Sequence, residues 1–204
     1  MSDFRKDYDD EWWEQHAVVR PTNPLQAVDD FELLIGTNPP EQEIQKFLTA
    51  CPWILATQFP HCHYLLPQFS FGGQFVADFV APERSSGGTQ WMLIEIERSD
   101  AKLTTTHGDY AETVRRAVRQ VKDWRCWLLE NQDIAKRERT HGGLGLFDMS
   151  RIVIGHVLVG RRSAMTPRFN MLRNETLSND VIQIQTYDGI IEWARNRARF
   201  WMGL

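Results

Sequence analysis

Apolar residues recur every three to four positions in five stretches of the chain, which is the spacing that places them on one side of a helix. Gly36 ends the first stretch, and the pair Pro39 and Pro40 opens the second, which stops near Cys51. The regular part of the third stretch begins after Gly108. The pattern therefore predicts helices over residues 25–35, 41–51, 104–131, 167–177 and 189–201.

Another five stretches are rich in β-branched and aromatic residues and are bounded by turn-forming residues, which is typical of strands. The first three follow one another as a meander, and residues 82–89 link the second to the third. Residues 132–148 are polar and Gly-rich, and they predict a mobile loop. The order of helices and strands predicts an α/β fold. The strands are expected over residues 64–71, 74–81, 90–97, 151–159 and 181–186.

The first 20 residues are acidic, and Pro21 and Pro24 then interrupt any helix. We therefore expect an acidic N-terminal extension over residues 1–24 and a single folded domain over residues 25–204. Trp12 and Trp13 lie among the acids of the extension. Two interpretations are open for this aromatic pair: it docks onto a partner chain, or it packs onto the domain that follows.

Composition narrows the class of protein. The chain has 204 residues, of which 42% are hydrophobic and 25% are charged, as in ordinary globular domains. Its longest apolar runs are far shorter than the roughly 20 residues that cross a bilayer, and its acidic N-terminus is unlike a signal peptide. Three cysteines at scattered spacings favour reduced thiols over disulfides. These features predict a cytoplasmic protein with no membrane partner.

Charge is divided unevenly between the two halves of the chain. Residues 1–99 carry 6 basic and 15 acidic side chains, a balance of −9, whereas residues 100–204 carry 17 basic and 12 acidic side chains, a balance of +5. The formal net charge of −4 therefore conceals a basic C-terminal half, with arginine clusters at 115–119, 161–162 and 195–199. Arg suits bidentate contacts to phosphate. The clusters are either solvated helix faces and strand ends or contacts for a nucleic acid.

Carboxylates interrupt two of the predicted strands, at positions where an unpartnered charge is costly. Asp78 lies inside the second strand, and Glu95 and Glu97 lie inside the third. Because side chains alternate along a strand, Glu95 and Glu97 share one face. If the two strands form a hairpin centred on Ser86 and Gly87, Asp78 lies directly opposite Glu95, with Cβ atoms about 4.5–5.5 Å apart.

Two carboxylates at that separation repel each other unless a cation lies between them. A hard divalent cation, Mg²⁺ or Mn²⁺, suits this place, and its candidate ligands are Asp78, Glu95 and the backbone carbonyl of Ile96. Such a site can orient and acidify a water for attack on a phosphodiester. The alternative interpretation is a row of carboxylates on an exposed sheet edge, which carries no chemistry.

Six segments carry a further pattern: Glu43–Leu48, Pro52–Leu55, Asp78–Val80, Leu93–Glu97, Ala117–Trp124 and Ile184–Asp188. In this order they resemble the PD-(D/E)xK nuclease superfamily and, within it, the C-terminal nuclease domain of the Shedu (SduA) anti-phage proteins. The resemblance runs from about Glu41 to Trp201. It implies a restriction-endonuclease-like core, in which a three-strand meander plus further strands form a central mixed sheet flanked by helices.

The resemblance also implies an activity, which is metal-dependent cleavage of DNA in anti-phage defence. Asp78 and Glu95 are then metal ligands, and Gln120 is a polar group at the site. Glu43 on the opening helix is an outer ligand or orienting carboxylate, with Glu41 as the alternative because the helix register is open. Besides DNA, we consider two protein partners: a second copy of the chain in a homo-oligomer, and another chain bound through the N-terminal extension.

Glu97 departs from the superfamily pattern, which places Lys at this position to stabilise the transition state. Some restriction enzymes of the superfamily are similar in having Glu there, so Glu97 is a candidate base or second-metal ligand. Alternatively, a lysine from elsewhere supplies the positive charge, and the candidates are Lys102, Lys46 and Lys122. The remaining alternative is a catalytically inactive nuclease-fold module for nucleic-acid binding or regulation.

Overall fold

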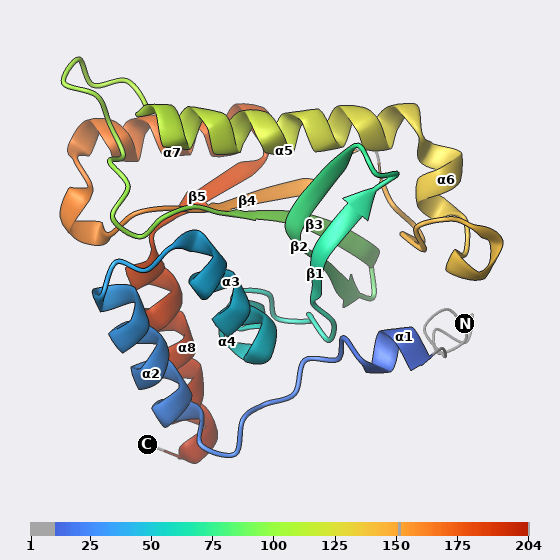
Figure 1. The fold of residues 1–204 in the computed structure, drawn as a ribbon, viewed down its shortest axis with the longest axis horizontal. Coiled ribbons are helices and arrows are strands. Elements are labelled where there is room, and N and C mark those ends of the chain that lie inside the picture. Colours follow the sequence, from blue (N-terminus) through green and yellow to red (C-terminus); the bar gives the residue numbers. More distant parts are fainter. Residues whose placement is uncertain (1–10, 151, 204) are drawn as a thin grey trace.

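The computed structural model describes residues 11–150 and 152–203, which fold around one five-stranded sheet (Figure 1). The strands lie in the order β1-β2-β3-β4-β5. The first three are antiparallel neighbours, whereas β3, β4 and β5 are parallel, so the sheet is mixed. The predicted α/β class and mixed sheet are confirmed. The strands are β1 (Leu66–Phe71), β2 (Phe75–Ser85), β3 (Gly88–Ile96), β4 (Ile154–Leu158) and β5 (Ile182–Gln185).

Helices cover both faces of the sheet, and all five predicted helices are present with shifted ends (Figure 1). One face carries α5 (Glu112–Glu130) and α7 (Pro167–Asp180). The other face carries α2 (Pro24–Gly36), α3 (Glu41–Ala50), α4 (Trp53–Ala56) and α8 (Tyr187–Met202). Within the described residues, each helix is too short or too polar to cross a membrane.

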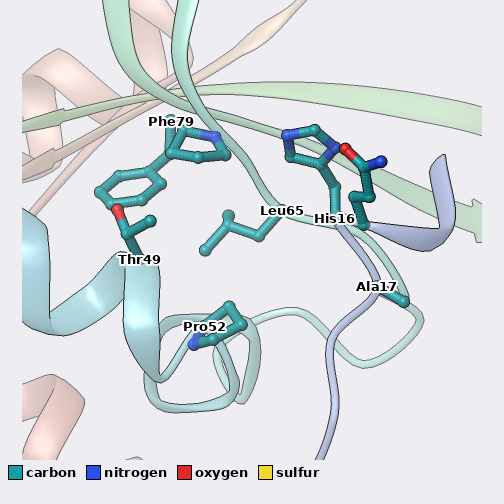
Figure 2. A pocket seen from close by; sticks show the side chains of 8 residues that line it. His16, Ala17, Thr49, Pro52, Leu65 and Phe79 are labelled. Atoms are coloured by element: carbon teal, nitrogen blue, oxygen red, sulfur yellow. The ribbon is translucent and has the colours of Figure 1, made fainter. Parts of the chain in front are cut away.

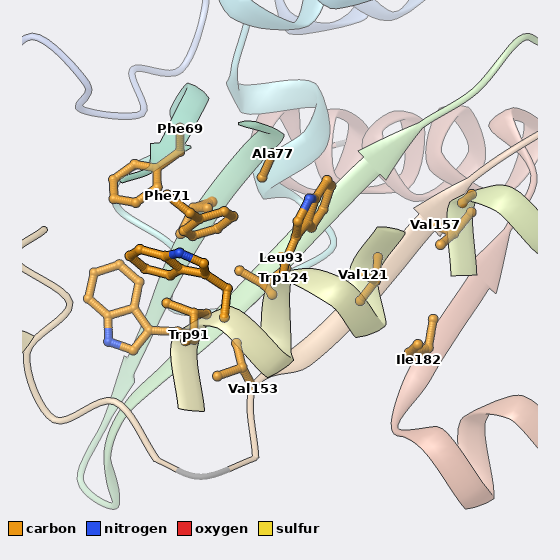
Figure 3. Packing of buried hydrophobic residues seen from close by; sticks show 14 of the residues in the cluster. Phe69, Phe71, Ala77, Trp91, Leu93, Val121, Trp124, Val153, Val157 and Ile182 are labelled. Carbon is orange, nitrogen blue, oxygen red and sulfur yellow. The ribbon is translucent and has the colours of Figure 1, made fainter. Parts of the chain in front are cut away.

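Each face of the sheet has its own hydrophobic cluster. In the cluster under α5, Trp124 packs on the ring of Phe71 at a centroid distance of 6.1 Å (Figure 3). Trp127 packs on the same ring at 5.8 Å. Both tryptophans are buried, because one side of α5 is apolar and faces the sheet. The same buried side includes Val114 and Ala117 near the start of α5, which fixes its first turns against the sheet.

Residues 82–89 are not the linker that we expected. β2 and β3 continue to the two-residue turn Ser86–Gly87, and their pairing reaches Ser85 and Gly88. Pro82 lies within β2 although a proline cannot donate to a ladder. It is tolerated here because the ladder from β1 ends at Val80, and the isolated bridge between Cys62 and Glu83 does not use the nitrogen of Pro82.

The expected mobile loop over residues 132–148 is also wrong. It contains α6 (Gln132–Lys136) and a 3₁₀ turn, Arg139–His141. Ala135 and Leu146 are fully buried, and the N–H of Leu146 donates to the carbonyl of Ala135 at 2.8 Å. The glycines suggested mobility, but the few apolar residues between them anchor the segment against the cluster under α5.

The tryptophan pair of the N-terminal extension packs onto the same chain. α1 (Glu11–Glu14) places Trp13 in the cluster under α5, where its ring lies 5.3 Å from Tyr64 and 6.4 Å from Trp91. The guanidinium of Arg139 lies 3.7 Å from the ring centre of Trp12. Of the two interpretations, packing onto the domain is the one that the structure bears out. The boundary at residue 24 stays a prediction, and residues 1–10 lie outside the described residues.

Gly155 of β4 lets α5 approach the sheet closely. A Cβ on this residue would lie 2.5 Å from Cγ1 of Val121 and 2.9 Å from Cγ1 of Ile182. We therefore expect Gly155→Ala to lower the free energy of unfolding by about 1–3 kcal/mol in urea titrations, as overpacked cores do. The matched control is Gly36→Ala, because nothing lies within 4 Å of that added methyl. An equal effect of the two variants would contradict the close approach.

Candidate active site

Two carboxyl groups meet at the open end of the β2–β3 hairpin, which is the end away from its turn. Phe79 pairs with Ile94 in the register that the Ser86–Gly87 turn predicts. One residue beyond this pair, the side chains of Asp78 and Glu95 share a hydrogen bond. Such a bond requires a proton on one of the two carboxyls, and the higher pKa of Glu95 assigns it to that residue. The expected juxtaposition of these two residues is therefore present in the structure.

The Asp78 carboxylate is held from two further sides. Its Oδ2 accepts the backbone N–H of Ile96 at 2.9 Å, and its Oδ1 accepts Nε2 of Gln68 at 3.3 Å. Gln68 lies in β1 with a φ of 48°, in the left-handed region that non-glycine residues rarely occupy. Strained backbone of this kind is found where a side chain must be aimed. The conformation of Gln68 turns its amide toward Asp78.

Burial dominates the acid–base properties of the pair. Glu95 is 5% exposed, and burial, with the negative charge of Asp78 second, raises its pKa to about 10. Burial also raises the pKa of Asp78, although the hydrogen bonds from Ile96, Glu95 and Gln68 act against that rise. Near neutral pH the two carboxyls therefore hold one proton between them, and their pKa values belong to the pair.

Glu97 lies on the same side of β3 as Glu95, and it pairs with an arginine. Nη2 of Arg116, in the second turn of α5, lies 2.9 and 2.7 Å from the two carboxylate oxygens of Glu97. Burial raises the pKa of Glu97, and the bond from Arg116 opposes the rise. The Tyr187 hydroxyl donates to the Glu97 carbonyl at 2.6 Å. An ion pair with α5 thus occupies the position, one residue beyond β3, where the resemblance to the nuclease superfamily implies Lys.

A fourth carboxylate reaches the site from α3, and it belongs to Glu41. Burial raises the pKa of Glu41 to about 6, and the charges of Glu97 and Asp78 add to the rise. Glu43 is exposed two residues further along the same helix. Ile44 and Leu48 fix this register because they are fully buried in the cluster beneath the sheet. The helix therefore places Glu41, the alternative in the predicted site, beside the other carboxylates.

The other predicted site residues lie further from this cluster. Gln120 is half-buried one turn beyond Arg116 on α5, and none of the site's hydrogen bonds among the described residues involves it. Lys122 pairs with Asp180 of α7 at 2.8 Å. Lys46 and Lys102 are exposed. In the part of the chain that the structure describes, the cation paired with Glu97 is Arg116 and none of the three lysines.

The donor set suits a hard cation in its chemistry but is not arranged as a complete ligand shell. Carboxylate oxygens are the ligands that Mg²⁺ prefers, and the charges of Glu41, Asp78 and Glu95 act on one another. Across residues 11–150 and 152–203, no three His, Cys, Asp or Glu side chains stand together as metal ligands. A bound Mg²⁺ would therefore keep several waters and displace the proton of the Asp78–Glu95 pair. Ile96 contributes its N–H to Asp78, and a role for its carbonyl stays a prediction.

A pocket of about 230 Å³ lies away from these carboxylates, between the α1 segment, the end of α3 and the first strands (Figure 2). Phe79, Leu65 and Pro52 line it. His16 is the one ionisable side chain of its lining, and its ring bonds the carbonyl of Trp12 at 2.6 Å. Among the described residues, no carboxylate lines this pocket, so His16 has none of the acidic partners of a hydrolytic site there.

Comparison with known families agrees with the order of these elements. The family model of the Shedu protein SduA, C-terminal, matches residues 38–191. This chain belongs to the Shedu SduA C-terminal family. The matched residues include α3, the whole sheet and the carboxylates at the end of the hairpin. No curated protein matches the chain. Membership of the Shedu family suggests a role in anti-phage defence, and a nuclease as the activity to test.

Three residues of the site escaped the sequence analysis. Arg116 was one of several helix arginines, and its contact with Glu97 depends on how α5 crosses β3. Gln68 looked like an ordinary strand residue, because backbone conformation at one position leaves no pattern in the sequence. Tyr187 stood in the segment Ile184–Asp188, before the predicted last helix, but nothing marked its bond to Glu97.

The raised pKa of Glu95 makes stability depend on pH. The pKa of Glu95 is about 10 in the folded chain and 4.5 in the unfolded chain. Its contribution to the stability of the folded chain is therefore complete below pH 4.5 and is lost as pH rises toward 10. We expect wild-type stability to fall from pH 5 to pH 8, by at most about 1.4 kcal/mol per pH unit for one proton. Glu95→Gln should flatten this dependence in urea titrations.

The control for that measurement is Glu130→Gln, which removes an exposed carboxylate at the far end of α5. It should follow the wild-type pH dependence. If Glu95→Gln also follows it, Glu95 does not hold the proton that its burial predicts.

Proposed function

We propose that the chain is a metal-dependent DNA endonuclease that acts in anti-phage defence and uses Mg²⁺ or Mn²⁺. The observation that carries the proposal is the contact between half-buried Asp78 and buried Glu95, where burial raises the pKa of both carboxyls. Natural proteins rarely bury several carboxylates together without a partner charge, because burial of an uncompensated charge is costly. A divalent cation in this place would remove that cost, so the pair favours a metal site over a purely structural role.

The architecture supports a PD-(D/E)xK core as part of this proposal. A hairpin that carries Asp on one strand and Glu on the next lies beside a helix that brings a third carboxylate, in the order that the resemblance implies. Family membership agrees with this order. The five-strand sheet with helices on both faces is the layout that such a core requires.

Each side chain has a defined task in the proposed reaction. Asp78 and Glu95 would hold the metal, and Gln68 and the N–H of Ile96 keep the Asp78 carboxylate oriented. Glu41 is ionised through part of the neutral range, with its pKa near 6, and suits an outer ligand or a proton acceptor for water. When bound, Mg²⁺ would supply positive charge that polarises the scissile phosphate.

DNA is the proposed partner because the C-terminal half is basic and supplies several helix arginines. A homo-oligomer and a partner chain at the N-terminal extension stay predictions. Cytoplasmic location stays one as well.

The second candidate is a catalytically inactive module that binds nucleic acid or regulates a partner. One observation favours it: Glu97 replaces the usual Lys, and its charge is already matched by Arg116. Without a free cation at this position, the site lacks the charge with which the usual Lys stabilises the transition state. Cleavage in the presence of metal separates the two candidates.

Metal binding and nicking provide that test. We expect calorimetric titration to detect Mg²⁺ and Mn²⁺ binding to the wild type, and a supercoiled plasmid to be nicked by the same sample. Glu95→Gln should weaken metal binding at least about tenfold and abolish nicking. Absence of metal binding to the wild type would make the carboxylates structural and end the nuclease proposal.

The pH dependence of metal affinity follows from the shared proton. A metal must displace the proton of the Asp78–Glu95 pair, so its affinity should rise with pH between 6 and 8, by up to about tenfold per unit for one proton. Calorimetry at three pH values checks this. An affinity that does not change with pH would mean that the cation binds elsewhere.

The two glutamates of α3 give a matched pair of variants. Glu41→Gln should weaken Mg²⁺ binding by about tenfold, since its charge acts on the carboxylate cluster. Glu43→Gln should change it less than about twofold, because Glu43 is exposed. If Glu43→Gln weakens Mg²⁺ binding more than Glu41→Gln does, α3 turns Glu43, and not Glu41, toward the carboxylate cluster.

A further inference from the structure

Arg116 brings a positive charge to the carboxylates at the end of β3. The two partners of its ion pair with Glu97 differ in burial. The side chain of Glu97 is 1% exposed, whereas that of Arg116 is 53% exposed. Enclosing both partners of an ion pair costs the desolvation of two charges, and this pair encloses only Glu97. Here one partner is fixed inside the protein and holds the other at the surface.

The hydrogen bonds of this pair use one nitrogen of the guanidinium. Both oxygens of Glu97 accept from Nη2, so the bonds to Glu97 leave the Nε and Nη1 donors to other acceptors. Arginine carries five donors in a planar fork that matches the oxygens of a phosphate. The charges of Glu41 and Glu95 both act on Arg116, which places its guanidinium beside the proposed metal site.

We propose that Arg116 binds a phosphate of the DNA backbone next to the carboxylate cluster, and that Glu97 is the positioning residue that holds its guanidinium there. The proposal rests on the function proposed above and deepens it. Glu97, at the position where the superfamily has Lys, would then serve to hold the guanidinium of Arg116. The cation comes from α5, and Glu97 directs it.

The first test measures DNA binding without cleavage. A fluorescently labelled duplex is titrated in EDTA, and again in Ca²⁺, over a series of salt concentrations. The slope of log affinity against log salt concentration is negative, and the loss of one phosphate contact makes it shallower by about 0.9. Arg116→Ala should show this loss and bind several-fold more weakly. Arg116→Lys should keep the slope, because it keeps the charge, but bind more weakly than the wild type because it lacks the fork.

Arg137→Ala is the control, since it removes the same charge from an exposed position. Arg137 follows α6, beyond the C-terminal end of α5, whereas Arg116 lies near the N-terminal end of that helix. We expect this variant to keep the wild-type slope. A slope of Arg116→Ala that equals those of the wild type and Arg137→Ala overturns the proposal. A wild type that does not bind the duplex overturns it as well.

Arg116→Ala leaves Glu97 buried without a partner, which destabilises the chain. The double variant Arg116→Ala/Glu97→Gln removes both charges and repeats the binding test if the single variant does not fold. Thermal unfolding followed by circular dichroism shows which variants are folded.

The task of Glu97 has a separate readout. Glu97→Gln keeps the charge of Arg116 and should keep the salt slope, but its nicking rate at saturating DNA should fall about tenfold or more. Glu97→Asp should recover part of that rate. If Glu97→Gln nicks at the wild-type rate, Glu97 is not a positioning residue. If the wild type binds DNA and does not nick it in Mg²⁺ or Mn²⁺, the nuclease proposal fails, and the salt slopes still decide whether Arg116 contacts phosphate.

Discussion

Repulsion between buried carboxylates is the interaction around which the rest of this site is arranged. The hairpin register brings Asp78 against Glu95, and burial keeps a proton between them at neutral pH. The neighbouring groups each lessen the repulsion. An N–H from Ile96 and the amide of Gln68 bond Asp78, and Arg116 balances Glu97. A divalent cation would do the same more completely, which is why the pair and the proposed metal belong together.

The two hydrophobic clusters hold these charges in place although each carboxylate favours water. β2 and β3 lie between clusters on both faces, so the hairpin end cannot splay without exposing buried side chains such as Phe79 and Ile94. α5 is fixed by its tryptophans, and α8 reaches the site through the bond from Tyr187 to the Glu97 carbonyl. The site therefore draws on both helical layers. Loss of stability in variants of these carboxylates and loss of activity have to be measured separately.

The sequence was sufficient for those parts of the site that depend on local geometry. Strand alternation and a two-residue turn at Ser86 determine which residues of the hairpin face each other, so the Asp78–Glu95 contact could be predicted. The choice between Glu41 and Glu43 could not, because it depends on how α3 packs against the sheet. The contact between Arg116 and Glu97 depends on how α5 crosses β3, and no spacing in the sequence encodes that crossing. The errors over residues 82–89 and 132–148 have the same origin, since tertiary packing overrode a proline and a group of glycines.

The most direct measurement is the ionisation of Glu95 by carbon-13 NMR of its carboxyl group, in the absence and then in the presence of Mg²⁺. Without metal, we expect the Asp78–Glu95 pair to keep one proton above pH 7, because burial and the neighbouring charge raise the pKa of Glu95 to about 10. With Mg²⁺, that proton should be released at the same pH, and the apparent pKa of the pair should fall. If both carboxyls ionise below pH 5 and Mg²⁺ does not change their titration, the pair is neither coupled nor a metal site.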